Sequence, residues 1–165
     1  MITDWDDAYA NGDHIADASS YPGMWAEQSA QFRDTLLATQ RTELDIAYGT
    51  GDREKYDLFL PDNTPKGLVV FVHGGYWKAF DKSSWSHLAN GAVAKGWAVC
   101  MPSYTLAPDA RLSQITSQIA AAINHAAAHI DGPIHLTGHS AGGHLVSRMV
   151  SETSPLLSDT LSRVK

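Results

Sequence analysis

Alternating and continuous runs of apolar residues predict two kinds of β-strand in this chain. Between Leu44 and Leu60, apolar and polar residues alternate on either side of a Gly-Thr-Gly-Asp turn. That pattern is typical of two antiparallel strands with one buried and one solvent-facing side. A third short apolar strand is expected at residues 134–137, whereas residues 68–72 and 97–101 form continuous apolar runs. Such runs favour parallel strands that are covered on both faces.

Helical patterns lie before and between these strands. In the segment after residue 111, Leu112, Ile115, Ile119 and Ile123 recur at steps of three and four and form one apolar stripe. An antiparallel start followed by strand-helix units predicts an α/β fold, with a mixed, mostly parallel sheet and helices on both faces. The expected helices cover residues 21–40, 83–95 (with a Ser N-cap and Gly96 as its stop), 112–130 and 141 to about 151.

The 165 residues fit a single domain, and we expect two parts within it. Residues 1–41 form an N-terminal extension with a helix. Residues 42–165 form the N-terminal portion of the α/β domain. We find no internal repeat, low-complexity tract or linker.

Charge and cysteine content exclude several classes of function. The chain has 12 Lys plus Arg and 18 Asp plus Glu, a net charge of −6, which argues against binding nucleic acid or anionic lipid. It has no apolar segment typical of a signal peptide or membrane span. Cys100 is alone and predicted to be a core residue, so we expect no disulfide and a cytoplasmic location.

The strongest chemical motif is Gly138-His-Ser-Ala-Gly142, placed where a strand passes directly into a helix. Such a G-x-S-x-G turn holds its central serine in a strained conformation, with the hydroxyl projecting from the top of the sheet. We therefore predict that Ser140 is a nucleophile. The neighbouring Ala141, at the helix N-terminus, would offer its N–H to an oxyanion.

A second motif, His73-Gly74-Gly75-Tyr76-Trp77, directly follows the strand at 68–72. Its glycines let the backbone turn N–H groups toward the same cavity, and we predict that Gly75 and Tyr76 complete an oxyanion hole with Ala141. We expect His73 to support this loop by hydrogen bonds. Trp77 lines a substrate pocket or fills the core beneath the loop, and both interpretations stay open.

These motifs resemble the α/β-hydrolase superfamily, in particular hormone-sensitive-lipase-like esterases and the kynurenine formamidase (arylformamidase) group. The His73–Trp77 loop is similar to the formamidase form, and 104–109 (Tyr-Thr-Leu-Ala-Pro-Asp) is similar to a Tyr-x-Leu-Ala-Pro-Glu segment of the esterases. The resemblance covers about residues 44–151. It implies an eight-stranded sheet, a serine nucleophile, and hydrolysis of a small ester or an N-formyl aryl amide. Gly74 of the loop and Gly138 and Gly142 of the elbow support this geometry, and His139 is a candidate residue of the substrate pocket.

A serine nucleophile needs a base, and in this fold an Asp or Glu and then a His follow it in the chain. Only 25 residues follow Ser140, and their one histidine, His144, is fixed on the helix that begins at the serine. We expect His144 to be structural. We also expect the triad acid and base and the C-terminal strands to lie outside this chain, because 134–137 would otherwise be an uncovered apolar edge. The 165 residues alone should then be catalytically silent.

No cofactor or metal is predicted. His125 and His129 are four residues apart, but no acidic third ligand accompanies them, so we interpret them as part of a packed or solvated helix face. The leading hypothesis is thus a serine hydrolase that acts on a small-molecule ester or amide. The alternatives are a non-catalytic α/β-hydrolase-like binding module and a half-site that another chain completes, and a homo-oligomer is left open.

Overall fold

The computed structural model describes residues 1–165 and is built on a five-stranded sheet in the order β1-β2-β4-β3-β5. β1 pairs antiparallel with β2, and β2 pairs antiparallel with β4, whereas β3 runs parallel to both β4 and β5. The sheet is therefore mixed, and it confirms the predicted α/β fold. Its strands are β1 (Thr42–Ala47), β2 (Lys55–Phe59), β3 (Leu68–Val72), β4 (Ala98–Pro102) and β5 (Ile134–Gly138).

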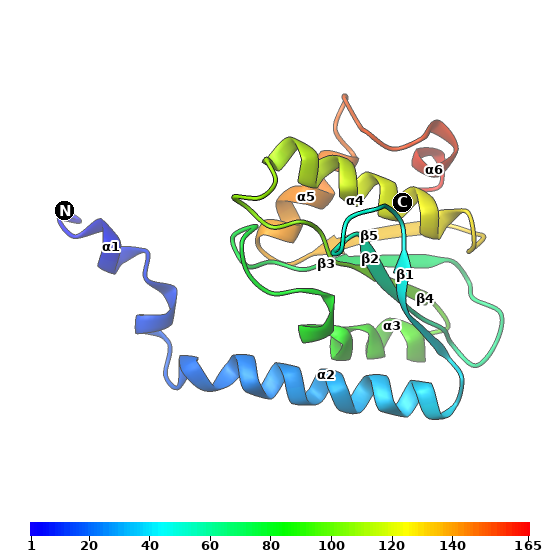
Figure 1. Ribbon diagram of the computed structural model, residues 1–165, viewed down its shortest axis with the longest axis horizontal. Helices are drawn as coiled ribbons and strands as arrows, with labels where there is room; N and C mark the ends of the chain where they lie inside the picture. The colour runs from blue at the N-terminus through cyan, green and yellow to red at the C-terminus, as the bar shows by residue number, and fades with distance from the viewer.

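Helices cover both faces of the sheet (Figure 1). On one face lie α2 (Tyr21–Ala38) and α3 (Asn90–Ala94), and on the other lie α4 (Leu112–Ala127), α5 (Ala141–Met149) and α6 (Ser158–Ser162). The shorter elements are α1 (Trp5–Ala8) and the 3-10 helices η1 (Asn11–His14), η2 (Ala18–Ser20), η3 (Lys82–Ser84) and η4 (Ser86–Ala89).

Strand β4 explains why the sheet has two separate cores. Ala98 and Cys100 belong to the larger cluster beneath α4 and α5, while Val99 and Met101 belong to the smaller cluster beneath α2. Successive side chains on a strand point to opposite faces, so an apolar run fills both layers at once. The continuous run at 97–101 was thus a correct signal for a strand covered on both sides.

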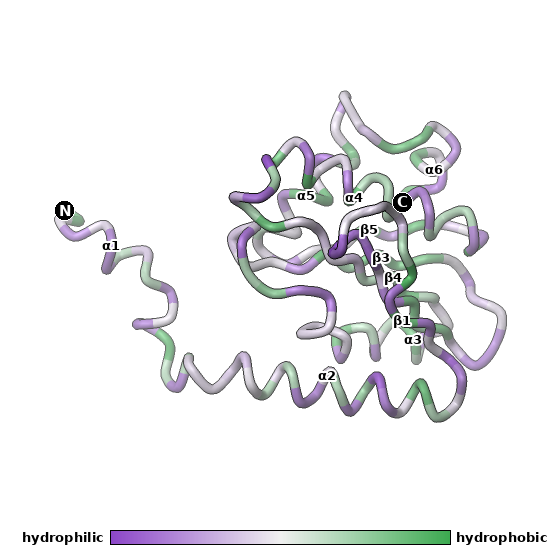
Figure 2. Tube along the Cα trace, in the orientation of Figure 1, coloured by the Kyte–Doolittle hydropathy of each residue, from purple (hydrophilic) through white to green (hydrophobic).

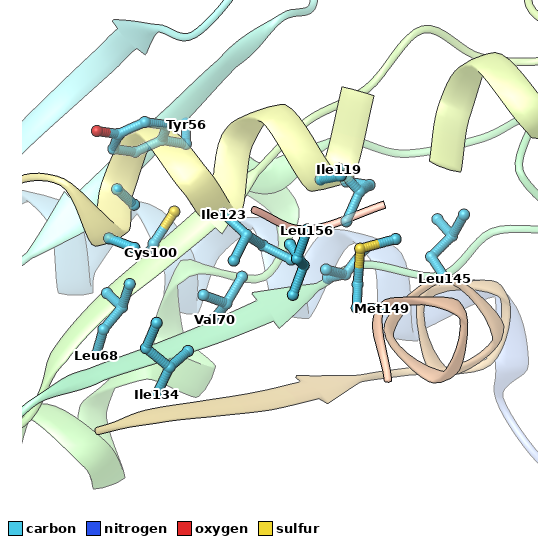
Figure 3. Packing of buried hydrophobic residues seen from close by; sticks show 14 of the residues in the cluster. Tyr56, Leu68, Val70, Cys100, Ile119, Ile123, Ile134, Leu145, Met149 and Leu156 are labelled. Atoms are coloured by element: carbon cyan, nitrogen blue, oxygen red, sulfur yellow. The ribbon is translucent and has the colours of Figure 1, made fainter. Parts of the chain in front are cut away.

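The apolar stripe of α4 supplies much of the larger core. Ile115, Ile119 and Ile123 are fully buried, and Figure 3 shows Ile119 and Ile123 packed close to Val70, Leu156 and other core residues. Burying a side chain of this size contributes roughly 1.5–3 kcal/mol to the free energy of folding.

Two local predictions were wrong. Residues 83–95 do not form one helix, because the chain folds as η3, η4 and then α3, and Asp81 rather than a serine caps the first of these. The polar side of β2 is not exposed to solvent, since Asp57 is only 1% exposed. Gly96, at a φ of 86°, does follow the end of α3 as expected.

The N-terminal arm and α2 lie at the margin of the molecule. Residues 1–20 extend away from the sheet and lead into α2, along which hydrophilic and hydrophobic positions alternate (Figures 1 and 2). On its inner side, Leu36 is buried in the smaller core, with Trp25 and Phe32 packed against it. No helix of the chain is long and apolar enough to cross a membrane.

Strand β5 forms the edge of the sheet. It carries exposed side chains at His135 and Thr137. Beyond it, Val164 makes a single parallel bridge with Ile134, in which the Ile134 N–H donates to Arg163 O at 2.9 Å. The loop at the carboxyl end of β5 leads directly to Ser140.

Candidate active site

Ser140 lies in the turn that joins β5 to α5, and its backbone is strained. Its φ of 52° and ψ of −116° are unusual for a residue with a Cβ, while Ala141 already begins the helix. The side chain is exposed at this turn. The predicted strand-turn-helix context of the Gly138–Gly142 motif is therefore present.

Glycine is required on both sides of the serine because the elbow is tightly packed. A Cβ on Gly138 would lie 2.4 Å from the carbonyl of Gly142, and one on Gly142 would lie 1.9 Å from the carbonyl oxygen of Val72. Real Cβ atoms do not approach backbone this closely. The two glycines thus let α5 pack directly against the ends of β5 and β3.

The loop after β3 lies against the elbow. We call residues 73–85, from His73 to Trp85, the oxyanion loop. A Cβ on Gly74 would be 2.7 Å from His139 O and 3.0 Å from the Ser140 Cβ. The two motifs, more than sixty positions apart in the chain, are therefore in direct contact.

Several backbone donors near this contact have no backbone acceptor, and they include the three predicted for the oxyanion hole. The N–H groups of Gly75, Tyr76 and Ala141 donate to no carbonyl. Gly75 has a φ of 107° and Tyr76 a φ of 52°, so the backbone reverses here, and Ala141 is the first residue of α5. Free donors at a loop and a helix N-terminus beside a serine are suited to binding a developing negative charge.

His73, the first residue of this loop, is buried. It is 1% exposed, its Nδ1 is 2.7 Å from Gly74 O, and its ring stacks on Tyr104 at a centroid distance of 4.3 Å. Nδ1 therefore carries the proton and donates to Gly74 O. Burial lowers the pKa of His73 to about 4, so the ring is neutral near pH 7. The Tyr104 hydroxyl also donates to His73 O at 3.0 Å.

Aromatic side chains flank the elbow on two sides. Trp77 packs against the larger core and meets the His144 ring edge-on at 5.4 Å, so it fills space beneath the loop. On the other side, the His139 ring lies 5.4 Å from Trp85. The exposed side chains at this end of the sheet include Tyr76 and His144.

The remaining histidines lie elsewhere or have other partners. His125 Nδ1 is 3.0 Å from the Tyr56 hydroxyl, His87 Nδ1 is 2.7 Å from Ser29 Oγ, and His14 Nε2 is 2.8 Å from Asp7 O. No group of three or more His, Cys, Asp or Glu side chains is arranged to hold a metal ion.

Sequence reasoning missed a charged cluster behind the oxyanion loop. Lys82 Nζ lies 2.7 Å from Asp57 Oδ1 and 2.8 Å from Asp45 Oδ1, and Arg53 donates to Phe80 O at 2.6 Å. Lys82 and Asp57 are 25 positions apart, on a loop and a strand, so no local pattern pairs them. Lys78 and Asp81 stand beside Lys82 in the sequence, so its charge alone does not mark it as buried.

Comparisons with known proteins identify the family and the fold of this chain. Residues 56–160 match the BD-FAE family model. The chain is 36% identical over 117 residues to kynurenine formamidase from Danio rerio, an alignment that covers 67% of this chain and 39% of that protein. It is 32% identical over 115 residues to the probable isoprenylcysteine alpha-carbonyl methylesterase ICMEL1 from Arabidopsis thaliana, covering 65% of this chain and 24% of that protein. The aligned part of the chain thus spans well under half the length of these relatives.

A solved structure matches almost the whole chain. The crystal structure of a thioesterase candidate from Silicibacter sp. TM1040 superposes with a TM-score of 0.93 at 58% identity, covering 97% of this chain and 60% of that one. The family match spans the β2 to α6 region that holds both site motifs. The chain therefore belongs to the BD-FAE family, and its fold is of the α/β-hydrolase type.

Proposed function

We propose that this chain carries the nucleophile and the oxyanion hole of a serine hydrolase that cleaves small carboxylic esters or N-formyl aryl amides. The observation that supports this proposal is the contact between Gly74 and Ser140, which brings the loop with the unbonded Gly75 and Tyr76 N–H groups against a strained serine. The formamidase and methylesterase names of the relatives support an acyl substrate.

The reaction proceeds through an acyl-enzyme. The Ser140 oxygen attacks the substrate carbonyl carbon while its proton passes to a general base, and the resulting oxyanion accepts hydrogen bonds from Gly75, Tyr76 and Ala141. The intermediate collapses, and the leaving alcohol or amine takes the proton. Water then attacks the acyl carbon with the base again accepting a proton, which releases the acid and restores Ser140.

The histidines of this chain do not supply that base in the proposal. His73 donates to Gly74 through Nδ1 and has a pKa of about 4, and His144 lies one turn along the helix that Ser140 begins. We place the acid and base outside these 165 residues, further along the polypeptide or on another chain. The shared part covers 39% of the zebrafish formamidase, which leaves room for both groups.

Fluorophosphonate labelling tests whether Ser140 is the nucleophile. The protein used is the natural product of the coding sequence. Labelling mapped to Ser140 by peptide mass spectrometry, and lost in Ser140→Ala, is expected. Ser147→Ala is the matched control, because Ser147 lies on the same helix and only donates to Gly143 O. A folded protein that stays unlabelled would support the non-catalytic binding module instead.

A substrate panel then separates the acyl classes. N-formylkynurenine, p-nitrophenyl acetate and an acyl-CoA thioester represent the amide, ester and thioester chemistries suggested by the relatives' names. Our proposal expects the first two to be turned over at higher kcat/KM than the thioester. A clear preference for the thioester would instead indicate thioester hydrolysis, the activity in the name of the Silicibacter protein. Native mass spectrometry of the active species shows whether a second chain completes the site.

A further inference from the structure

The oxyanion loop is held in a conformation that its own residues disfavour. Gly75, Tyr76, Trp77 and Phe80 have φ angles of 107°, 52°, 58° and 68°. Each non-glycine residue at positive φ costs on the order of 1 kcal/mol or more, and such conformations persist only when the surrounding structure fixes them. The loop therefore needs anchors beyond its first residues.

The first anchor is the side chain of Lys82. Its Nζ reaches the buried Asp57 of β2 at 2.7 Å and Asp45 of β1 at 2.8 Å. Its backbone N–H donates to Ser103 Oγ at 3.0 Å. Lys82 is only 8% exposed and Asp57 is 1% exposed, so the pair lies inside the protein. One residue of the loop is thus fixed to three neighbouring segments.

The second anchor acts two residues earlier. Arg53 donates through Nη2 to Phe80 O at 2.6 Å and through Nε to Tyr104 O at 2.8 Å. Phe80 has a positive φ, so this hydrogen bond is made to one of the strained residues of the loop. Together, Arg53 and the Lys82–Asp57 pair fix the far half of the loop, while Gly74 and His73 fix its start.

A buried ion pair is a weak source of net stability compared with packed apolar groups, because both charges lose their hydration. A buried ion pair does fix the positions of its two residues, since either charge destabilises the fold when it is buried without the other. Burial lowers the pKa of Lys82, but the two carboxylates raise it more, and the net direction is upward. Lys82 stays cationic, so this constraint persists across the neutral range.

We propose that the buried Lys82–Asp57 pair, together with Arg53, is a positioning device for the oxyanion hole, which holds the Gly75 and Tyr76 N–H groups where the tetrahedral intermediate forms. This inference rests on the proposed function. None of the three residues touches the substrate, and all act through the backbone of the loop.

The test removes both charges together, because a single substitution would leave a buried unpaired charge and destabilise the fold. Lys82→Met with Asp57→Asn keeps an acceptor for the Asp45 N–H, which donates to Asp57 Oδ1 at 2.9 Å. We expect kcat for p-nitrophenyl acetate to fall about tenfold or more, as when an oxyanion donor is displaced, with KM changed less than about twofold. Inhibition by a trifluoromethyl ketone, which forms a tetrahedral adduct with the serine, should weaken in parallel.

The matched control is the exposed ion pair between Arg41 and Asp62, 2.9 Å apart and outside the loop. Arg41→Met with Asp62→Asn should leave kcat, KM and inhibition unchanged. If the Lys82/Asp57 double variant does not fold, Arg53→Met provides the second test, since it frees Phe80 O without burying an unpaired charge. It should show the same loss in kcat at constant KM.

The two proposals fail in different ways. Wild-type protein that is not labelled at Ser140 by fluorophosphonate contradicts the proposed function. Wild-type protein that is labelled, together with a folded double variant of unchanged kcat, contradicts only the positioning role. A fall in kcat with no weakening of trifluoromethyl ketone inhibition also overturns it, because the oxyanion hole would then be intact.

Discussion

Gly74 and Ser140 are in contact across the two site motifs: a methyl group on Gly74 would lie 3.0 Å from the Ser140 Cβ and 2.7 Å from His139 O. Neither neighbour can move freely, because His139 O also accepts from the Gly142 N–H at 2.8 Å. A side chain at Gly74 therefore pushes the oxyanion loop away from the serine.

Gly74→Ala is accordingly expected to lower kcat by about 100-fold, the effect of removing one oxyanion donor. Overpacking should also reduce the free energy of unfolding by about 1–3 kcal/mol. Ester hydrolysis and thermal unfolding measure the two effects. Gly91→Ala is the control, because nothing lies within 4 Å of its Cβ position in α3. That change should leave kcat intact, and equal activity of both variants would contradict the contact.

Gly142 and Gly143 are adjacent on α5 but differ sharply in their surroundings. A Cβ on Gly142 would lie 1.9 Å from Val72 O, whereas one on Gly143 would lie 3.5 Å from Gly138 O, an ordinary contact. Gly142→Ala should lower the free energy of unfolding by about 3 kcal/mol or prevent folding. Gly143→Ala should be neutral or stabilising by up to about 1 kcal/mol, because alanine favours a helix. Urea unfolding of both variants checks this, and similar losses would count against the tight elbow.

The sequence was sufficient to predict the structure where the local residue pattern and the tertiary fold require the same residue types. The run at 97–101 is apolar because both faces of β4 are buried, and the glycines at 138 and 142 are needed because α5 packs on the strand ends. In both cases the structural requirement involves residues that are only a few positions apart, so it can be recognised in a short stretch of sequence.

The sequence was insufficient where the constraint is long-range. Asp57 alternates with apolar neighbours and was expected on a wet face, but Lys82 from another segment covers it. Likewise, the positive φ angles of Tyr76, Trp77 and Phe80 run against the preferences of those residues. Contacts from distant segments accompany them, such as Arg53 on Phe80 O and Asp57 on Lys82, and no local window contains both sides of such contacts.

Acidification should destabilise the fold through His73. Burial depresses the native-state pKa from 6.5 to about 4, so the unfolded chain binds a proton between these values that the native protein does not. Stability therefore falls as the pH drops from 6.5 to about 4, by a total of about 3 kcal/mol from this group. Urea unfolding at pH 7 and pH 4.5 measures the loss.

A variant isolates this contribution from that of other groups. His73→Asn keeps a donor toward Gly74 O and removes the titrating ring, so its pH dependence should be visibly shallower than that of the wild type. His87→Asn is the comparison. Burial also lowers the pKa of His87, but less than it lowers that of His73, so this variant should change the pH dependence less. An unchanged slope in His73→Asn would show that the pKa of His73 is not lowered in the native state.

Cys100 should be unreactive in the native protein. It is fully buried in β4, and burial raises the pKa of its thiol, so almost no thiolate is available for attack on a reagent. Reaction with a disulfide reagent such as DTNB should proceed at the rate of global unfolding and accelerate with urea. Fast labelling without denaturant, with secondary structure intact, would indicate a local opening of the sheet at this strand.

Because of its backbone conformation, position 140 should be more stable as glycine than as alanine. At φ 52° and ψ −116°, a residue with a Cβ is strained by roughly 1–3 kcal/mol, and only glycine adopts these angles freely. At an unstrained site the order is reversed, because glycine loses more conformational entropy on folding than alanine. Both substitutions remove the hydroxyl, so the comparison isolates the backbone from the lost side chain. We expect Ser140→Gly to unfold at a higher urea concentration than Ser140→Ala, by about 1 kcal/mol, while neither is labelled by fluorophosphonate. If alanine were the more stable of the two, the strain would be absent, and the serine would sit in an ordinary turn rather than a nucleophile elbow.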